Sequence, residues 1–356
     1  MPMGVDNKEI SANTDHLFSA ILLEQQKINA IRPADVRKKE YSDILLKEYE
    51  SLRGRGFFYP YLSTGRGHGP FSELVDGSVK YDLIGHMGVG LLGRSHPLYI
   101  RACLEAATCD TIICGNLLVY QESLELSKIL LQQVKKSKLR HFWFAGSGSF
   151  AGDMALKIIW QKKNPRYRMI AFERAFAGRS IATGEITANP AYRMGMPNLL
   201  AVDHVPFFSD KDPQGSLNKT MQALENLWKK HGSEYAGITV ELVQGEAGFS
   251  HGNKKYFSEI FKWAKKHQLY IWIDEVQTFG RTRELFCFQM LGLDNFVDIV
   301  TVGKSLQCCG VLFSDELNPK PLLIAGTFVG SLSAIKAGYK TVHYLTEGNF
   351  YGEKGR

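Results

Sequence analysis

Residues able to do chemistry follow three short apolar runs of the sequence. A glycine and serine turn at residues 146–149 follows the first run, Asp274 ends the second, and Lys304 ends the third. A glycine turn at the start of a helix presents free backbone N–H groups, which suit a phosphate. A lysine that loses hydration has a lowered pKa and becomes a nucleophilic amine. Together the three indicate a phosphorylated aldehyde attached to the lysine, with the acid paired to a pyridine nitrogen.

Taken singly, each of these features also has an ordinary structural interpretation. A Gly/Ser turn before a helix commonly caps that helix, and this one lacks the lysine of a P-loop and the glycine spacing of a dinucleotide fingerprint. Asp274 could be an acid in a surface loop and Lys304 a solvated charge. The chemical interpretation depends on the three sites meeting in the fold.

The elements that would bring these sites together begin at about residue 96. Apolar periodicity predicts helices over 96–108, 122–138, 150–163, 220–232 and 257–268, and strands over 141–145, 168–173, 199–204, 237–243, 270–276, 298–303 and 322–327. This alternation predicts βαβ units and a mostly parallel central sheet with helices on both faces. Ligands of such sheets bind at the carboxyl ends of the strands, so the turn, the acid and the lysine are expected there.

The N-terminal part has a different pattern. Residues 1 to about 60 are charged and have helical periodicity, and the glycine-rich segment 65–70 is expected to be a loop. Residues 71–83 alternate around Asp76-Gly77 in the manner of a β-hairpin.

Composition excludes several classes of protein. The 356 residues are 44% hydrophobic, which is enough for a large core and excludes a disordered chain, a collagen and a disulfide scaffold. The net charge of +7 comes from short basic runs beside apolar periodic segments, which indicate solvated helix faces and no nucleic-acid partner. Six cysteines without paired or metal-ligand spacing predict no metal and a reducing cytoplasm. Because no run of about 18 apolar residues occurs, no membrane span is predicted.

A series of motifs occurs in order between about residues 65 and 335. They are Gly93-Arg94-Ser95-His96-Pro97, Ser147-Gly148-Ser149, Ala155-Leu156-Lys157, Phe176-Ala177-Gly178-Arg179, Glu241-Leu242-Val243-Gln244-Gly245-Glu246, Asp274-Glu275-Val276-Gln277, Gly303-Lys304 and Gly326-Thr327-Phe328. In this order they resemble the class III, pyridoxal-phosphate-dependent aminotransferases, the group of ornithine, acetylornithine, 4-aminobutyrate and lysine ε-aminotransferases. The resemblance implies an α/β chain of the PLP-dependent transferase fold type I that forms a homodimer.

The resemblance also implies a site for pyridoxal 5′-phosphate. Lys304 would form a Schiff base, the internal aldimine, and then move protons, while Asp274 would keep the pyridine nitrogen protonated. The other contacts would be those of Gly148 and Ser149 to the phosphate, Phe176 and Val276 to the two ring faces, Gln277 to the phenolic oxygen, and Thr327 from the partner subunit.

For the substrates, an amino acid donor and a 2-oxo acid acceptor, the resemblance implies a pocket lined by three charged residues. Arg179 matches an arginine that binds a substrate carboxylate, a task for which the planar guanidinium is suited. Glu241 and Glu246 match acids that line the same pocket.

The sequence departs from the family pattern at several positions. Phe150 stands where the family has Glu, Gly152 where it has Asn, Ala177 where it has His, and Leu242 where it has Pro. These departures leave the exact subfamily, and therefore the substrate, open.

Family members also continue beyond the point where this sequence ends, into a piece that carries a second arginine. Glu246 is therefore expected to be unpaired. We expect an N-terminal arm and part of a small domain over 1–95, a large PLP-binding domain over 96–335, and the start of a truncated, incomplete small domain over 336–356.

The predicted function is transfer of an amino group, the ω-amino group of ornithine, acetylornithine, 4-aminobutyrate or lysine, to 2-oxoglutarate. Two alternatives use the same motifs: a shortened PLP-binding relative with little or no activity, and an aminomutase or decarboxylase. The presence of Lys304, Asp274, Gln277 and Arg179 favours the aminotransferase, whereas the short C-terminus favours the inactive relative.

Overall fold

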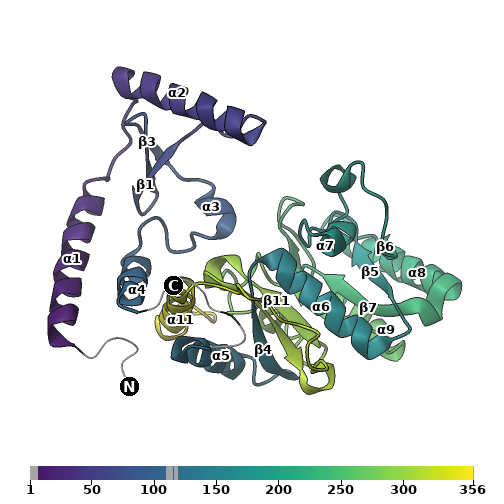
Figure 1. The fold of residues 1–356 in the computed structure, drawn as a ribbon. Helices are drawn as coiled ribbons and strands as arrows, with labels where there is room; N and C mark the ends of the chain where they lie inside the picture. Colours follow the sequence, from purple (N-terminus) through teal and green to yellow (C-terminus); the bar gives the residue numbers. More distant parts are fainter. Residues whose placement is uncertain (1–6, 110–114, 116–118, 356) are drawn as a thin grey trace. The chain divides into compact units, whose positions relative to one another are not determined.

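The computed structural model describes residues 7–109, 115 and 119–355. Contacts divide the chain into two compact units, Met1–Asp110 and Thr111–Arg356. All the candidate cofactor and substrate residues lie in the second unit, which also contains the large sheet (Figure 1). The domain boundaries predicted at residues 95 and 335 stay predictions.

A seven-stranded sheet forms the centre of the second unit. Its strands are, in spatial order, β4 (Leu139–Ala145), β12 (Cys309–Ser314), β11 (Ile299–Val302), β10 (Tyr270–Asp274), β7 (Tyr235–Val240), β5 (Arg168–Phe172) and β6 (Val202–Val205). β12 is antiparallel to both of its neighbours, and the other pairs are parallel. The mostly parallel central sheet was correctly predicted. A small antiparallel pair, β8 (Val243–Gln244) and β9 (Ser250–His251), lies outside it.

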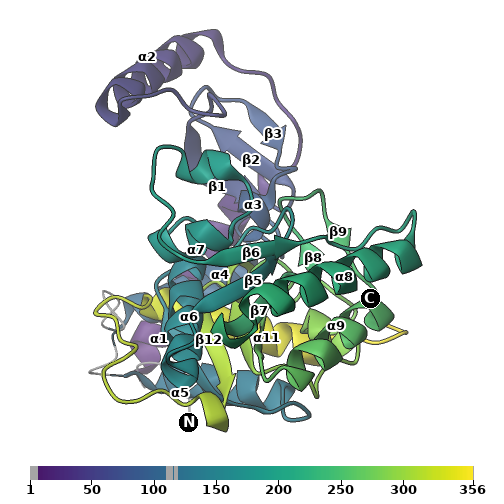
Figure 2. The ribbon, with the colours of Figure 1, turned by 90° about the vertical axis from the view of Figure 1, so that its right-hand side faces the viewer.

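Helices cover both faces of this sheet (Figures 1 and 2). α6 (Gly148–Lys163) crosses one face and contacts strands from β4 to β7, while α9 (Lys254–Lys266) packs on β10 and α8 (Pro213–His231) on β6. The unit also contains α5 (Gln121–Gln133), α7 (Ile181–Ile186), α10 (Cys287–Met290) and α11 (Leu332–Glu347). Within the described residues, no helix is both long and apolar enough to span a bilayer.

The start of α6 is fixed by its packing on the sheet. Ala151, Met154, Ala155 and Ile158 are fully or almost fully buried and form one hydrophobic cluster with Trp272 of β10. Because the helix follows β4 after a two-residue turn, this packing places its N-terminus at the carboxyl end of the strands.

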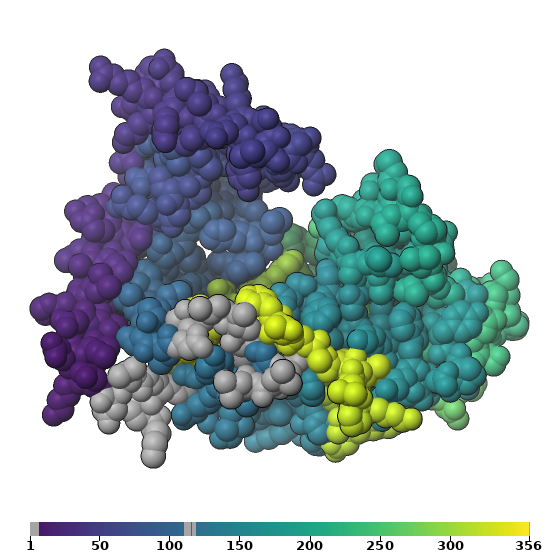
Figure 3. All heavy atoms as spheres, viewed as in Figure 1, coloured from purple at the N-terminus to yellow at the C-terminus, as the bar shows by residue number. Residues whose placement is uncertain are grey.

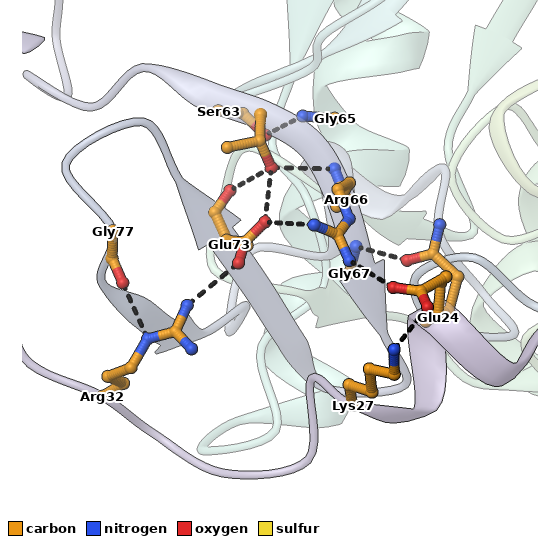
Figure 4. A network of polar contacts seen from close by, with 11 residues as sticks. Glu24, Lys27, Arg32, Ser63, Gly65, Arg66, Gly67, Glu73 and Gly77 are labelled. Atoms are coloured by element: carbon orange, nitrogen blue, oxygen red, sulfur yellow. Dashed lines mark hydrogen bonds and ion pairs between the residues drawn. The ribbon is translucent and has the colours of Figure 1, made fainter. Parts of the chain in front are cut away.

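The first unit contains α1 (Lys8–Gln26), α2 (Val36–Arg53), β1 (Ser63–His68), β2 (Phe71–Leu74), β3 (Val79–Tyr81), α3 (Gly85–Gly88) and α4 (Pro97–Ala107). The three strands form an antiparallel sheet, and β2 and β3 confirm the predicted hairpin. Glu73 of β2 lies 2.9 Å from Arg32 and 3.5 Å from Arg66, so one carboxylate joins the sheet to the segment after α1 (Figure 4).

Two predictions of secondary structure were wrong, and one strand was missed. The apolar segment 322–327 is not a strand, because Leu322 has a left-handed φ of +72° and is 97% exposed. Only Ile324 of the segment is buried, and the end of the chain to which the segment belongs is yellow in Figure 3. The expected loop at 65–70 contains most of β1, which pairs with β2. β12 was not predicted, because its apolar run Val311–Phe313 is too short for periodicity to identify.

Candidate active site

The turn between β4 and α6 has the features of a phosphate site. The Ser147 hydroxyl accepts a hydrogen bond from the Phe150 N–H at 3.1 Å and so caps the helix. The N–H groups of Gly148 and Ser149 occupy the first two helical positions, where no intrahelical acceptor exists. The cap therefore leaves these two donors, at the positive end of the helix dipole, for an anion.

The segment after β5 closes on this turn. The Arg179 N–H donates to the Ser149 hydroxyl oxygen at 3.1 Å, so the Ser149 hydroxyl proton is available to donate elsewhere. Gly178 has a φ of +138°, and a Cβ there would lie 2.6 Å from Thr183 Oγ1 and would also collide with Ser149 Oγ. Only glycine, which has no Cβ, allows the backbone at residue 178 to lie this close to Ser149 and Thr183.

Asp274 is the last residue of β10 and is buried. Its carboxylate accepts the Val276 N–H at 2.9 Å. Burial raises the pKa of Asp274 to about 6, while the hydrogen bonds from Val276 and Thr301 and the charge of Lys304 act in the opposite direction. A buried carboxylate of this kind is suited to a cationic partner such as a protonated pyridine.

Lys304 follows β11 in a left-handed conformation, with a φ of +47°. A non-glycine residue with this backbone is strained, and such strain is typical of functional sites. Burial lowers the pKa of Lys304, and the charge of Asp274 opposes this effect. The Lys304 ammonium contacts the side-chain oxygen of Gln277. Val276 packs close by, since a Cβ at Gly148 or Gly303 would lie 3.2 or 3.4 Å from its methyl groups.

Glu241 is buried and joins two loops of the site. One carboxylate oxygen accepts the Phe176 N–H at 2.9 Å and the other accepts the Gly245 N–H at 3.1 Å. Burial and the charge of Asp274 raise the pKa of Glu241 to about 8. One carboxyl group therefore orients the backbone at both Phe176 and Gly245.

Arg179 and Glu246, expected in one pocket, form a cluster with Tyr192, which sequence reasoning did not identify. The Arg179 guanidinium lies over the Tyr192 ring, 4.3 Å from its centroid, and the Tyr192 hydroxyl donates to Glu246 at 3.1 Å. The ring of Phe176 meets Tyr192 edge to face at 5.7 Å. The phenol supplies Glu246 with a hydrogen-bond donor, and the expectation that no arginine pairs with Glu246 stays a prediction. Tyr192 lies in an aperiodic segment, and no sequence signal indicated its role.

Thr327 is exposed and lies in the surface segment after β12. The backbone of this segment passes the turn of its own chain, since a Cβ at Gly146 would lie 3.1 Å from the Phe328 carbonyl oxygen. A Cβ at Gly115 would lie 2.7 Å from the Thr327 carbonyl oxygen. A contribution of Thr327 to the partner's site stays a prediction.

The fold and the site together define a class: a mostly parallel, helix-covered sheet with a turn, an acid and a lysine at its strand ends is the fold type I arrangement of PLP-dependent transferases. The family described as aminotransferase class III matches residues 57–353, and the chain belongs to this family of enzymes. The cofactor of the family is pyridoxal 5′-phosphate, and its substrates are an amino donor and a 2-oxo acid acceptor.

Individual relatives are distant. Acetylornithine aminotransferase of Aquifex aeolicus is 27% identical over 81% of this chain and 77% of its own length. Alanine/serine racemase of Pyrococcus horikoshii is also 27% identical, over 81% of this chain and 63% of its own length. The structure of taurine:2-oxoglutarate aminotransferase from Bifidobacterium kashiwanohense has a TM-score of 0.77 at 19% identity, covering 88% of this chain and 74% of that one.

The residues of this site fit the cofactor. The two free amides and the Ser149 hydroxyl suit its phosphate, the buried Asp274 suits its ring nitrogen, and Lys304 is an amine whose pKa burial lowers. The three lie on elements that the sheet brings to one edge.

Proposed function

We propose that this chain transfers the ω-amino group of an amino acid, such as ornithine, acetylornithine, 4-aminobutyrate or lysine, to 2-oxoglutarate. The observation that carries the proposal is the Lys304–Gln277 contact beside the buried Asp274, at the strand ends that face the turn of α6. When bound, the cofactor supplies an electron sink for the carbanion at the substrate carbon.

Each residue of the site has a task in this proposal. The Lys304 amine would hold the cofactor and would move a proton to and from the substrate carbon. Its lowered pKa leaves more of the amine neutral, and therefore nucleophilic, than a solvated lysine would have. Gln277 orients the amine. Asp274 keeps the ring nitrogen protonated, because its negative charge lies where water cannot screen it.

Arg179 is the proposed ligand of a substrate carboxylate. Among the described residues Arg179 makes no ion pair. Its guanidinium is stacked on the Tyr192 ring, which orients the planar group without neutralising its positive charge. A dicarboxylic acceptor such as 2-oxoglutarate has a carboxylate whose two oxygens can both accept hydrogen bonds from one guanidinium.

We also propose that the chain works as a homodimer in which Thr327 reaches the partner's phosphate site. The exposure of Thr327 and the large exposed apolar side chains of α2, namely Val36, Ile44 and Leu52, support an interface with a second copy.

The proposal is tested with purified protein reconstituted with pyridoxal 5′-phosphate. Adding an ω-amino acid should remove the visible absorbance of the bound cofactor, and adding 2-oxoglutarate should restore it. Lys304→Ala should lose both changes and release its cofactor on dialysis, whereas Lys219→Ala, at an exposed lysine of α8, should behave as the wild type.

Two results would contradict the proposal. Stable absorbance with every donor would indicate a cofactor-binding protein without transfer. Racemisation of an α-amino acid without need of an acceptor would indicate the reaction named for the Pyrococcus horikoshii relative.

A further inference from the structure

Three side chains on neighbouring strands form a buried polar chain behind the cofactor site. Asp274 of β10 lies opposite Thr301 of β11, and Trp272 lies two residues before Asp274, on the same face of the sheet. The Trp272 indole N–H donates to the Thr301 hydroxyl oxygen at 3.0 Å. The register places Thr301 beside Asp274, and its hydroxyl lowers the pKa of the Asp274 carboxyl.

The direction of these hydrogen bonds is fixed by chemistry. An indole nitrogen can only donate, whereas a hydroxyl has one proton and two lone pairs. With its oxygen accepting from Trp272, the Thr301 hydroxyl keeps its proton for another acceptor, and the Asp274 carboxylate is its register partner on β10. Trp272 and Thr301 have no exposed surface, so water cannot replace either partner.

The indole fits because residue 152 is glycine. A Cβ at Gly152 of α6 would lie 3.2 Å from the Trp272 ring and 2.6 Å from a methyl carbon of Thr183. Contacts this short require the indole or the helix to move. The departure from the family pattern at Gly152 therefore accompanies a tryptophan beneath the helix.

We propose that Trp272 and Thr301 are positioning residues that hold the Asp274 carboxylate directed at the pyridine nitrogen. This inference rests on the role proposed for Asp274. The Thr301 hydrogen bond favours the carboxylate over the neutral acid, which opposes the effect of burial. Without it, Asp274 protonates at a higher pH and loses the charge that pairs with the ring.

The test measures cofactor affinity of the apoprotein by absorbance titration, with pyridoxal 5′-phosphate and with an analogue whose ring nitrogen is replaced by carbon. Thr301→Val removes the hydroxyl at nearly constant volume and should weaken binding of the natural cofactor about 10- to 100-fold. Trp272→Phe, which frees the hydroxyl to rotate, should weaken it severalfold. Thr301→Ser, which keeps the hydroxyl, should restore most of the affinity.

The analogue distinguishes an effect on the position of Asp274 from a general effect of the substitutions on the structure of the site. It cannot pair with Asp274, so the variants should bind it as well as the wild type does. Trp263→Phe is the matched control, because it removes another buried indole donor, the one bound to Glu225 at 2.8 Å on α8. Its affinity for both ligands should be unchanged.

Two results would overturn the inference: equal loss of affinity for both ligands, or no loss in Thr301→Val and Trp272→Phe. If the melting curve shows that Thr301→Val does not fold, the cofactor affinities of Trp272→Phe and Thr301→Ser decide whether the inference holds. Asp274→Asn separates the role of Asp274 from its positioning by Trp272 and Thr301. If it leaves affinity for the natural cofactor unchanged, the role proposed for Asp274 is itself wrong, whereas a loss in Asp274→Asn alone overturns only the positioning by Trp272 and Thr301.

Discussion

Replacing Gly178 by alanine should damage the phosphate site selectively. The new Cβ would lie 2.6 Å from Thr183 Oγ1 and 2.9 Å from Ser149 Cβ, in a backbone with a φ of +138°. Overpacking of this kind costs about 1–3 kcal/mol, and a left-handed backbone adds about 1–2 kcal/mol for an L-residue. The free energy of unfolding should therefore fall by about 2–5 kcal/mol, which lowers the melting temperature by roughly 4–10 °C.

The same clash should reach the cofactor. Ser149 must turn away from the new methyl group, which removes both its contact with the Arg179 N–H and its hydroxyl from the phosphate site. We expect Gly178→Ala to weaken binding of pyridoxal 5′-phosphate more than binding of pyridoxal, which has no phosphate. Absorbance titration of the apoprotein measures both affinities.

Gly184 provides the matched control for this prediction. It lies in α7, six residues further along, and a Cβ there would meet nothing within 4 Å. Gly184→Ala should keep cofactor affinity and gain a little stability, because alanine favours a helix over glycine by up to about 1 kcal/mol. If the two variants have the same melting temperature and the same two affinities, the packing of Gly178 on Ser149 is wrong.

Three further outcomes follow from the site. Arg179→Ala should raise the KM for 2-oxoglutarate about 10- to 100-fold and leave that of a simple ω-amine unchanged, since only the acceptor loses a charge-assisted bond; equal effects on both would place the carboxylate elsewhere. Tyr192→Phe keeps the ring under Arg179 but releases Glu246 to compete for it, so steady-state kinetics should show a severalfold higher KM for 2-oxoglutarate that Glu246→Gln reverses. The raised pKa values of Glu241, about 8, and Asp274, about 6, mean that the folded apoprotein binds more protons than the unfolded chain, so its free energy of unfolding should fall between about pH 4 and 8. Melting curves of Glu241→Gln should show a shallower fall above about pH 6, and an unchanged slope would contradict the burial of that acid.

Strand ends could be predicted from the sequence because their signal is local. Asp274 and Lys304 each follow an apolar run long enough to identify a strand, and the glycine turn precedes a periodic helix. Parallel topology then brings such ends to one edge. The Lys304–Gln277 contact and the pKa shifts of Asp274 and Lys304 are consistent with that reasoning.

The partners of these residues could not be predicted in the same way. Thr301 has the sequence appearance of a core strand residue, and its hydroxyl acquires a role only through its register with Asp274. Tyr192 belongs to an aperiodic segment whose path depends on tertiary contacts. The apolar segment 322–327 has the composition of a strand, but in the described residues no strand pairs with it.

The central claim is that nitrogen moves from an amino acid to a 2-oxo acid at Lys304. The most direct measurement follows a donor whose terminal amino group carries an isotopic nitrogen label, incubated with the reconstituted protein and unlabelled 2-oxoglutarate. Mass spectrometry should find the label in glutamate, at a rate that Lys304→Ala abolishes and Lys219→Ala does not change. Label that stays in the donor while the cofactor is bound, or that reaches glutamate equally fast in Lys304→Ala, would contradict the account.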